Sequence, residues 1–308
     1  MHDSRNVVTT MISSRAYPPR IALGVTILAE ISGPFVFGVA VANSIGRGIA
    51  DPAAVDLKVI LAALVTAILW NLFTWQLKVP SSSSHALIGG IVGAASAHAG
   101  AGAIKMDGLI RILVSLFASP IIGFIFGFVL LKIVLALCWD ANPRINNFFK
   151  RSQLLTALAL GLSHGSNDGQ KTMGVITLAL FTGGYIQSFT VPFWVVCACA
   201  LALALGTAAG GWTLLRRPSR VYYTIRPVDG FTTQLTSALV IIGASLTGGP
   251  VSATQVINTA IIGVGAAERA NKVRWGMALD IVTAWVLTIP ATASAAIAIF
   301  WLIDRFLF

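Results

Sequence analysis

The sequence predicts an all-α polytopic membrane protein built from two related repeats, and its composition is the first reason. Of its 308 residues, 56% are apolar and only 10% are charged, and the mean hydropathy is +0.84. A soluble domain carries about 25% charged residues, so this chain has too few charges to cover a surface that faces water. A membrane-spanning helix needs about 20 apolar residues, and about ten segments here reach membrane depth. A β-barrel would instead show short alternating segments.

An internal repeat is the second reason. A shift of 170 residues places the polar cluster 80–85 on 250–255 and Gly93 on Gly263. The same shift places Pro120 on Pro290, each inside a long apolar run, and brings the run 57–77 close to 230–246. Internal repeats are typical of secondary transporters. We expect a first transport repeat over 21–140 and a second over 141–308.

The earlier part of each repeat matches at another offset, 128, which lays 37–46 over 165–174. The two offsets differ by 42 residues, so the second repeat must hold an insertion. We expect it to be an extra helix over 188–214 followed by a basic loop over 215–229. Whether the repeats are inverted stays open at this point.

The polar stretch 1–20 lacks the apolar core of a cleavable signal peptide, so we expect an N-terminal tail. The charge balance is 21 Lys and Arg against 11 Asp and Glu. The basic residues gather between apolar runs, as in the cytoplasmic loops of membrane proteins. We therefore expect the chain to contact membrane lipid and not nucleic acid. We assign the basic loop to the cytoplasm.

A helix N-terminus is predicted where Pro80 is followed by four serines and then by a helical pattern from Ala86. Such an end offers free N–H groups and a positive dipole, and serine hydroxyls add donors without adding charge. The second copy, at 250–255, predicts a similar helix N-terminus, with Ser252 and Thr254 following Pro250. Two such ends facing each other near the midplane would hold one anion. The alternative is that these hydroxyls only pack and bond back to carbonyl groups.

The second polar cluster, "SHGSNDGQKTMG" at 163–174, is expected to break the chain between apolar helices 153–162 and 174–182. Asn167 and Asp168 offer hard oxygen ligands, suited to Na⁺. Lys171 either contacts the anion or neutralises Asp168 in a structural ion pair. Glu30 precedes a break expected at Gly33–Pro34. Its carboxylate either reaches the membrane interface or, if it is buried against the site, is able to carry a proton.

No catalytic motif for a nucleophile elbow, a P-loop or a zinc protease is present, so an enzyme is not expected. His85 and His98 have no carboxylate or cysteine at ligand spacing, which argues against a bound metal cofactor. Cys138, Cys197 and Cys199 are interpreted as small membrane side chains.

Three stretches, 68–94, 162–176 and 225–257, resemble the inorganic phosphate transporter (PiT) family over nearly the whole chain. The resemblance implies two repeats with broken or re-entrant helices, a central phosphate site and a coupled cation, Na⁺ or H⁺. The implied phosphate ligands are Ser82, Ser83, Ser84, Ser252, Thr254 and Lys171. The implied cation-binding or coupling residues are Asn43, Asn167 and Asp168, and the sequence position of Glu30 adds it as a candidate coupling residue.

The sequence departs from the family pattern in the first Asn-Asp motif. Val39 and Ala40 stand at the Asn-Asp positions, and only Asn43 remains. Two alternatives follow: one cation site survives, with Na⁺ at Asn167 and Asp168, or Glu30 supplies the lost carboxylate and the coupling ion is a proton. We favour the proton.

The sequence therefore predicts a multi-pass phosphate symporter of the cell inner membrane, without a cofactor other than the coupling ion and with assembly into a homo-oligomer as an open option. The alternatives are a sulfate permease of the same family, a passive anion channel and a non-transporting sensor on the same fold.

Overall fold

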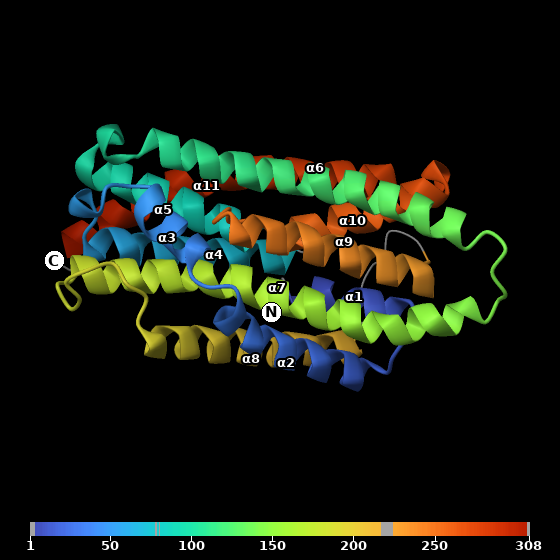
Figure 1. Ribbon diagram of the computed structural model, residues 1–308. Coiled ribbons are helices and arrows are strands. Elements are labelled where there is room, and N and C mark those ends of the chain that lie inside the picture. The colour runs from blue at the N-terminus through green and yellow to red at the C-terminus, as the bar shows by residue number, and fades with distance from the viewer. Residues whose placement is uncertain (1–3, 78, 80, 217–223, 307–308) are drawn as a thin grey trace.

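A computed structural model describes residues 4–77, 79, 81–216 and 224–306 of the chain. Over these ranges the chain is helical apart from short connections and an isolated β-bridge between Ala50 and Ile104. The α-helices are α1 (Ser4–Ser13), α2 (Pro19–Val36), α3 (Ala40–Gly48), α4 (Leu57–Leu77), α5 (Ser83–Ala99), α6 (Met106–Leu137), α7 (Ile145–Thr182), α8 (Phe193–Arg216), α9 (Pro227–Leu246), α10 (Ala253–Glu268) and α11 (Trp275–Phe306). They lie side by side along one long direction (Figure 1), which confirms the all-α fold class.

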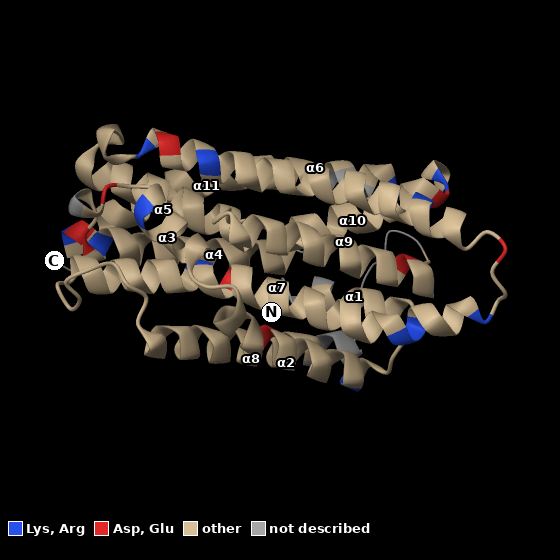
Figure 2. Ribbon diagram, viewed as in Figure 1, with Lys and Arg blue, Asp and Glu red and all other residues tan. Residues whose placement is uncertain are grey.

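The surface of the helix bundle suits a membrane. Most charged residues gather at its two ends (Figure 2). In the part of the chain that the structure describes, five helices are long and apolar enough to cross a membrane: α2, α4, α6, α8 and α11. Large apolar side chains such as Leu69, Ile121 and Leu205 are exposed between the charged ends. Outward-facing apolar side chains between polar ends are stable in lipid, so the chain is a membrane-embedded protein.

The repeat predicted from the sequence is confirmed by two helical hairpins, each followed by a long helix. The hairpin α4–α5 leads into α6, and the hairpin α9–α10 leads into α11. The shift of 170 residues carries Leu57, the first residue of α4, onto Pro227, the first residue of α9. It also carries the start of α5 onto the start of α10. Pro120 inside α6 corresponds to Pro290 inside α11 in the same way.

Both hairpins return to the end of the bundle from which they came. At the base of the first hairpin, His98 Nε2 lies 3.9 Å from Asp56 Oδ2. At the base of the second, Arg226 Nη2 lies 3.0 Å from Glu268 Oε2. The repeat places these two pairs at equivalent positions, with the carboxylate and the basic side chain exchanged. The hairpins are therefore re-entrant, as the family resemblance implied.

The two hairpins enter from opposite ends, because the inserted helix α8 reverses the direction of the chain. Helices α2 and α7 run in parallel, since Thr26 lies against Gly161 and Pro34 lies against Gly169. Helix α4 follows α3 after the short 3₁₀ turn Pro52–Ala54, whereas α8 first carries the chain back along the bundle before α9 begins (Figure 1). In consequence α6 and α11 run in opposite directions. The second hairpin is thus an inverted copy of the first.

Each hairpin packs against the long helix of the other repeat, α5 on α11 and α10 on α6. Glycines bring these helices close together. A Cβ atom on Gly93 would lie 2.1 Å from the carbonyl oxygen of Ala293, and one on Gly263 would lie 2.2 Å from that of Phe124. Because real Cβ atoms do not approach so closely, both positions require glycine. The repeat therefore preserves a packing contact as well as a polar cluster.

The expected break at 163–174 is wrong, because α7 runs without interruption from Ile145 to Thr182. The glycines of this stretch serve packing instead. A Cβ atom on Gly165 would lie 2.3 Å from the carbonyl oxygen of Glu30, so α7 needs a flat surface where α2 crosses it. Small residues at spacings of four produce such close approach in membrane helices. The polar residues stay helical because their side chains find partners on the surrounding helices.

Other sequence predictions differ in detail. Helix α2 continues through Pro34, and the chain turns at Gly38, which has a φ of +72°. The expected tail 1–20 contains α1, whose Val7 and Met11 are buried against neighbouring helices. The expected extra helix corresponds to α8. Part of the basic loop 215–229, namely 217–223, lies outside the described residues, and so does Pro80.

Candidate functional site

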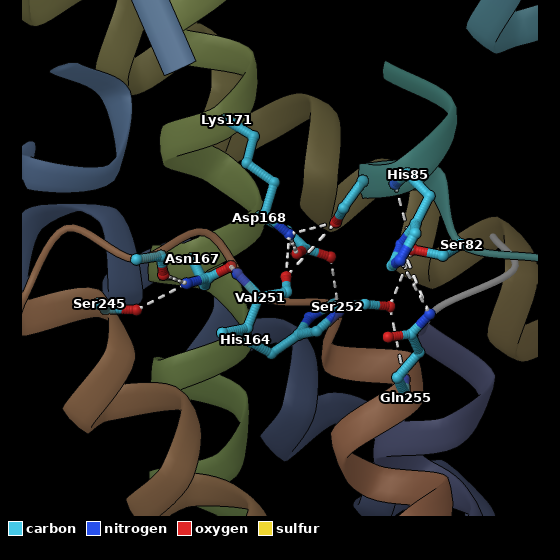
Figure 3. Close-up of polar contacts among 12 residues, drawn as sticks. Ser82, His85, His164, Asn167, Asp168, Lys171, Ser245, Val251, Ser252 and Gln255 are labelled. Atoms are coloured by element: carbon cyan, nitrogen blue, oxygen red, sulfur yellow. Dashed lines mark hydrogen bonds and ion pairs between the residues drawn. The ribbon is translucent and has the colours of Figure 1, made fainter. Parts of the chain in front are cut away.

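The N-termini of α5 and α10 meet in the interior of the bundle (Figure 3). Ser82 is the N-cap of α5, and its Oγ accepts a hydrogen bond from the backbone N–H of His85. Ser252 is the N-cap of α10 and accepts in the same way from Gln255. The Ser82 hydroxyl donates to Ser252 Oγ over 3.0 Å. The two helix ends therefore face each other, as the repeat predicted.

The predicted anion ligands gather around this contact. Ser82, Ser84, Ser252 and Thr254 are buried, and Ser83 is partly buried. His85 Nδ1 lies 2.8 Å from Ser82 Oγ, and the Gln255 amide lies 3.4 Å from both ring nitrogens of His85. These are polar groups from both hairpin tips within one buried region. That they bind phosphate stays a prediction.

Lys171 reaches from α7 to both hairpins. Its ammonium group donates to Ser84 Oγ over 2.6 Å and to the backbone oxygen of Val251 over 2.5 Å. It also forms an ion pair with Asp168 at 2.6 Å. The ammonium thus connects α7 to the tips of α4–α5 and α9–α10. A role for Lys171 as a direct phosphate ligand remains a prediction.

His164 is a site residue that the sequence interpretation missed. Its Nδ1 lies 2.8 Å from Glu30 Oε1 and its Nε2 lies 3.0 Å from Asp168 Oδ2. The ring and the Glu30 side chain are fully buried. Glu30 also accepts a hydrogen bond from Thr207 of the inserted helix α8. The spacing of His164, Asp168 and Lys171 places them on one face of α7, and this signal is readable in the sequence.

The predicted cation ligands are not gathered in one place. Asn167 Oδ1 accepts from the backbone of Val251 over 3.3 Å, and its amide donates to Ser245 over 2.9 Å. Asn43 is exposed on α3. One oxygen of Asp168 contacts Lys171 and the other contacts His164. A Na⁺ ion at Asn167 and Asp168 therefore stays a prediction and requires rearranged side chains.

The sequence interpretation also missed Gln170, which stabilises the start of α3 next to Val39 and Ala40, the residues at the first Asn-Asp positions. Its Oε1 accepts from the backbone N–H of Val41 over 2.8 Å, and its amide donates to Ser166 over 2.9 Å. Val41 is at the start of α3, whose N-cap residue, Val39, provides no side-chain cap. The glutamine on α7 thus satisfies a helix end whose own N-cap residue has no polar side chain.

A membrane protein in which two inverted re-entrant hairpins meet tip to tip around a buried polar cluster has the architecture of a secondary transporter. The sequence model of the phosphate transporter family matches residues 1–142 and 138–296. The chain belongs to this family and is a transporter, not an enzyme.

Similar proteins and a solved structure agree with this assignment. The chain is 43% identical over 304 residues to a probable low-affinity inorganic phosphate transporter of Bacillus subtilis, covering 97% of this chain and 91% of the relative. It is 43% identical over 295 residues to one of Rhizobium meliloti, covering 95% and 88%. A solved structure described as the sodium-dependent phosphate transporter matches with a TM-score of 0.92 over 99% of this chain and 95% of that chain. At 22% identity, this match shows a shared fold.

Proposed function

We propose that the chain is a symporter that carries inorganic phosphate with a coupling cation across the cell inner membrane, and that the cation is a proton. The proposal rests chiefly on the contact between Ser82 and Ser252. Each serine caps a hairpin helix, and the N-termini of these two helices face each other. One hairpin belongs to each repeat. A substrate held between them touches both repeats at once.

The physical case for an anion rests on these helix ends. Each N-terminus carries roughly +0.5 of an elementary charge and unpaired N–H groups. Two such ends that face each other in a low dielectric repel unless an anion lies between them. Phosphate binding replaces the Ser82–Ser252 bond with hydrogen bonds from both hydroxyls to the anion. The relatives from Bacillus and Rhizobium, described as inorganic phosphate transporters, support phosphate over sulfate.

The case for a proton rests on the row Glu30, His164 and Asp168. An imidazole that faces a carboxylate on each side makes two favourable contacts only when both ring nitrogens carry a proton, or when one carboxylate does. The row therefore holds one proton more than a neutral imidazole between two carboxylates would. Glu30 is fully buried and is connected to the hairpin tips through His164, Asp168 and Lys171, and it is the proposed proton carrier. The sodium-dependent neighbour makes Na⁺ the alternative.

Radiolabelled phosphate uptake into proteoliposomes of purified protein tests the function. Na⁺ and pH gradients are imposed separately, each at zero membrane potential. Accumulation above the outside concentration with an inward proton gradient is expected. Flux that never exceeds equilibration would indicate a passive channel, and absence of flux under all gradients would indicate a sensor on the same fold.

A further inference from the structure

The Lys171 ammonium group lies in a cage of three oxygens that come from three elements. They are Asp168 Oδ1 at 2.6 Å, Ser84 Oγ at 2.6 Å and the Val251 backbone oxygen at 2.5 Å. Figure 3 shows the Lys171 side chain extending from α7 toward Asp168 and Val251. Lys171 is 5% exposed, so the charge lies inside the protein.

The composition of this cage suits a small cation. A carboxylate, a hydroxyl and a backbone carbonyl are hard oxygen ligands, and hard monovalent and divalent cations prefer such oxygens. A lysine ammonium is a compact point charge with three donors. All three donors have an oxygen partner here, so the cage is matched to the cation that occupies it.

The cage also joins the parts that must move relative to one another in a transporter. Ser84 belongs to the first hairpin, Val251 to the tip of the second and Asp168 to α7. A cation in this position holds the two inverted hairpins and α7 together. Without a positive charge, three oxygens that include a carboxylate would face one another in a region that excludes water, which is unfavourable.

We propose that the Lys171 ammonium takes the place of a coupling sodium ion at this cage, so that this chain has a built-in cation where a Na⁺ ion would otherwise bind. The inference rests on the proposed phosphate symport and adds a statement about ion dependence. Lys171→Ala empties the cage of its cation but leaves all three oxygens, so Na⁺ or methylammonium binds there in the variant.

The surrounding charges agree with a fixed cation. The second oxygen of Asp168 faces His164 Nε2 at 3.0 Å, and His164 faces Glu30 at 2.8 Å. Among the described residues, His85 is a further titratable side chain near the tips, and it contacts Ser82 rather than the cage. The Lys171 ammonium thus already compensates the nearest carboxylate, Asp168. An additional Na⁺ beside Lys171 would add an uncompensated charge.

The test compares wild type, Lys171→Ala and Lys132→Ala in proteoliposomes, with choline, Na⁺ or methylammonium at fixed pH and potential. Lys132 is an exposed lysine of α6 and serves as the matched control. Wild type and Lys132→Ala are expected to take up phosphate equally in choline and in Na⁺. Lys171→Ala is expected to lose about tenfold or more in choline, the scale of lost charge-assisted hydrogen bonds, and to recover in Na⁺ or methylammonium.

A binding measurement keeps the test independent of transport. In detergent, Na⁺ is expected to raise the melting temperature of Lys171→Ala but not that of wild type. Strict Na⁺ dependence of wild-type uptake overturns the inference while leaving phosphate symport intact. A Lys171→Ala variant that neither recovers uptake nor gains Na⁺-dependent stability also overturns it. If wild type accumulates no phosphate under any gradient, the proposed function fails. The melting measurement then decides alone whether Na⁺ binds at the three oxygens in Lys171→Ala.

Discussion

The hydroxyl groups of Ser82 and Ser252 lie 3.0 Å apart although 170 residues separate them in the chain. Each caps one of two helices that are related by the inverted repeat. Because the two residues occupy equivalent positions, the site has an approximate internal symmetry. Substitutions at the two serines should therefore act alike.

We expect Ser82→Ala and Ser252→Ala each to raise the phosphate concentration for half-maximal uptake by about 10- to 100-fold. Each variant loses a hydrogen bond to a charged ligand, worth about 1.5–3 kcal/mol. The measurement is initial uptake rate against phosphate concentration in proteoliposomes. Ser294→Ala is the control, because Ser294 is exposed on α11 and bonds back to Pro290. Wild-type affinity in both site variants would show that the hydroxyls serve packing only.

Asp168→Asn is expected to abolish concentrative uptake while the protein still inserts and folds. The variant removes the charge that both His164 and Lys171 contact. Breaking a buried ion pair by removing one partner costs about 3–5 kcal/mol, because the remaining charge is left without compensation. Asp304→Asn is the matched control, since Asp304 pairs with Lys58 near the bundle end and is 41% exposed. Normal accumulation by Asp168→Asn would remove this carboxylate from the mechanism.

Much of the fold could be predicted from the sequence because the repeat leaves a regular trace. A single offset located both hairpins, both long helices and the glycines that pack them. The serine-rich helix ends were also predictable, since N-caps have a local signature. The direction of the second hairpin could not be predicted, because it depends on whether the inserted segment crosses the bundle.

The polar part of α7 shows where sequence reasoning fails. Glycines and polar residues at 163–174 suggested a broken helix, but the helix persists because Gly165 packs against Glu30 of α2. Intrahelical propensity does not register a partner that lies on another helix. The same limit hid His164, whose importance arises from Glu30, a residue 134 positions earlier in the chain. Its spacing of four from Asp168 was the available signal.

Helix packing gives a prediction about stability. We expect Gly93→Ala and Gly263→Ala to lower the melting temperature in detergent, because the added Cβ atoms would overlap backbone oxygens at 2.1 and 2.2 Å. Overpacking of this kind costs about 1–3 kcal/mol or more. Gly243→Ala of α9 is the control, since no atom lies within 4 Å of its Cβ position. That variant should be neutral or slightly stabilising, as alanine favours helix over glycine. Equal melting temperatures for all three variants would contradict the close helix contacts.

Glu30→Gln is expected to uncouple uptake from the proton gradient. The amide keeps the size of the side chain but cannot carry a proton, and it leaves His164 with one carboxylate instead of two. Phosphate accumulation in an inward pH gradient should fall to the level reached by passive exchange. Glu268→Gln is the control, because Glu268 pairs with Arg226 at the base of the second hairpin and makes no contact with His164. If Glu30→Gln retains activity and uptake requires Na⁺ at fixed pH, the proton assignment fails and the phosphate assignment stands.

Selectivity follows from the protons that the substrate carries. Phosphate near neutral pH has one or two hydroxyl groups, whereas sulfate has none. Asp168 and Ser84 both contact the Lys171 ammonium, so a site at this place is able to accept a hydrogen bond from a phosphate hydroxyl as well as donate to its oxygens. Sulfate presents only acceptors to that carboxylate, and mismatched buried polar groups give discrimination of about 10⁴-fold or more in favourable cases.

We therefore expect excess arsenate, which has the same shape and protons as phosphate, to compete with radiolabelled phosphate at comparable concentration. Sulfate should not compete until far higher concentration. The comparison is made at one pH and constant ionic strength, so that charge screening is equal for both competitors. The diagnostic variant is Asp168→Asn, assayed for binding instead of uptake. Loss of the carboxylate should lower the affinity for phosphate and raise the affinity for sulfate. Equal competition by sulfate and arsenate in wild type would show that the site does not select phosphate over sulfate and would mean that the carboxylate does not face the substrate.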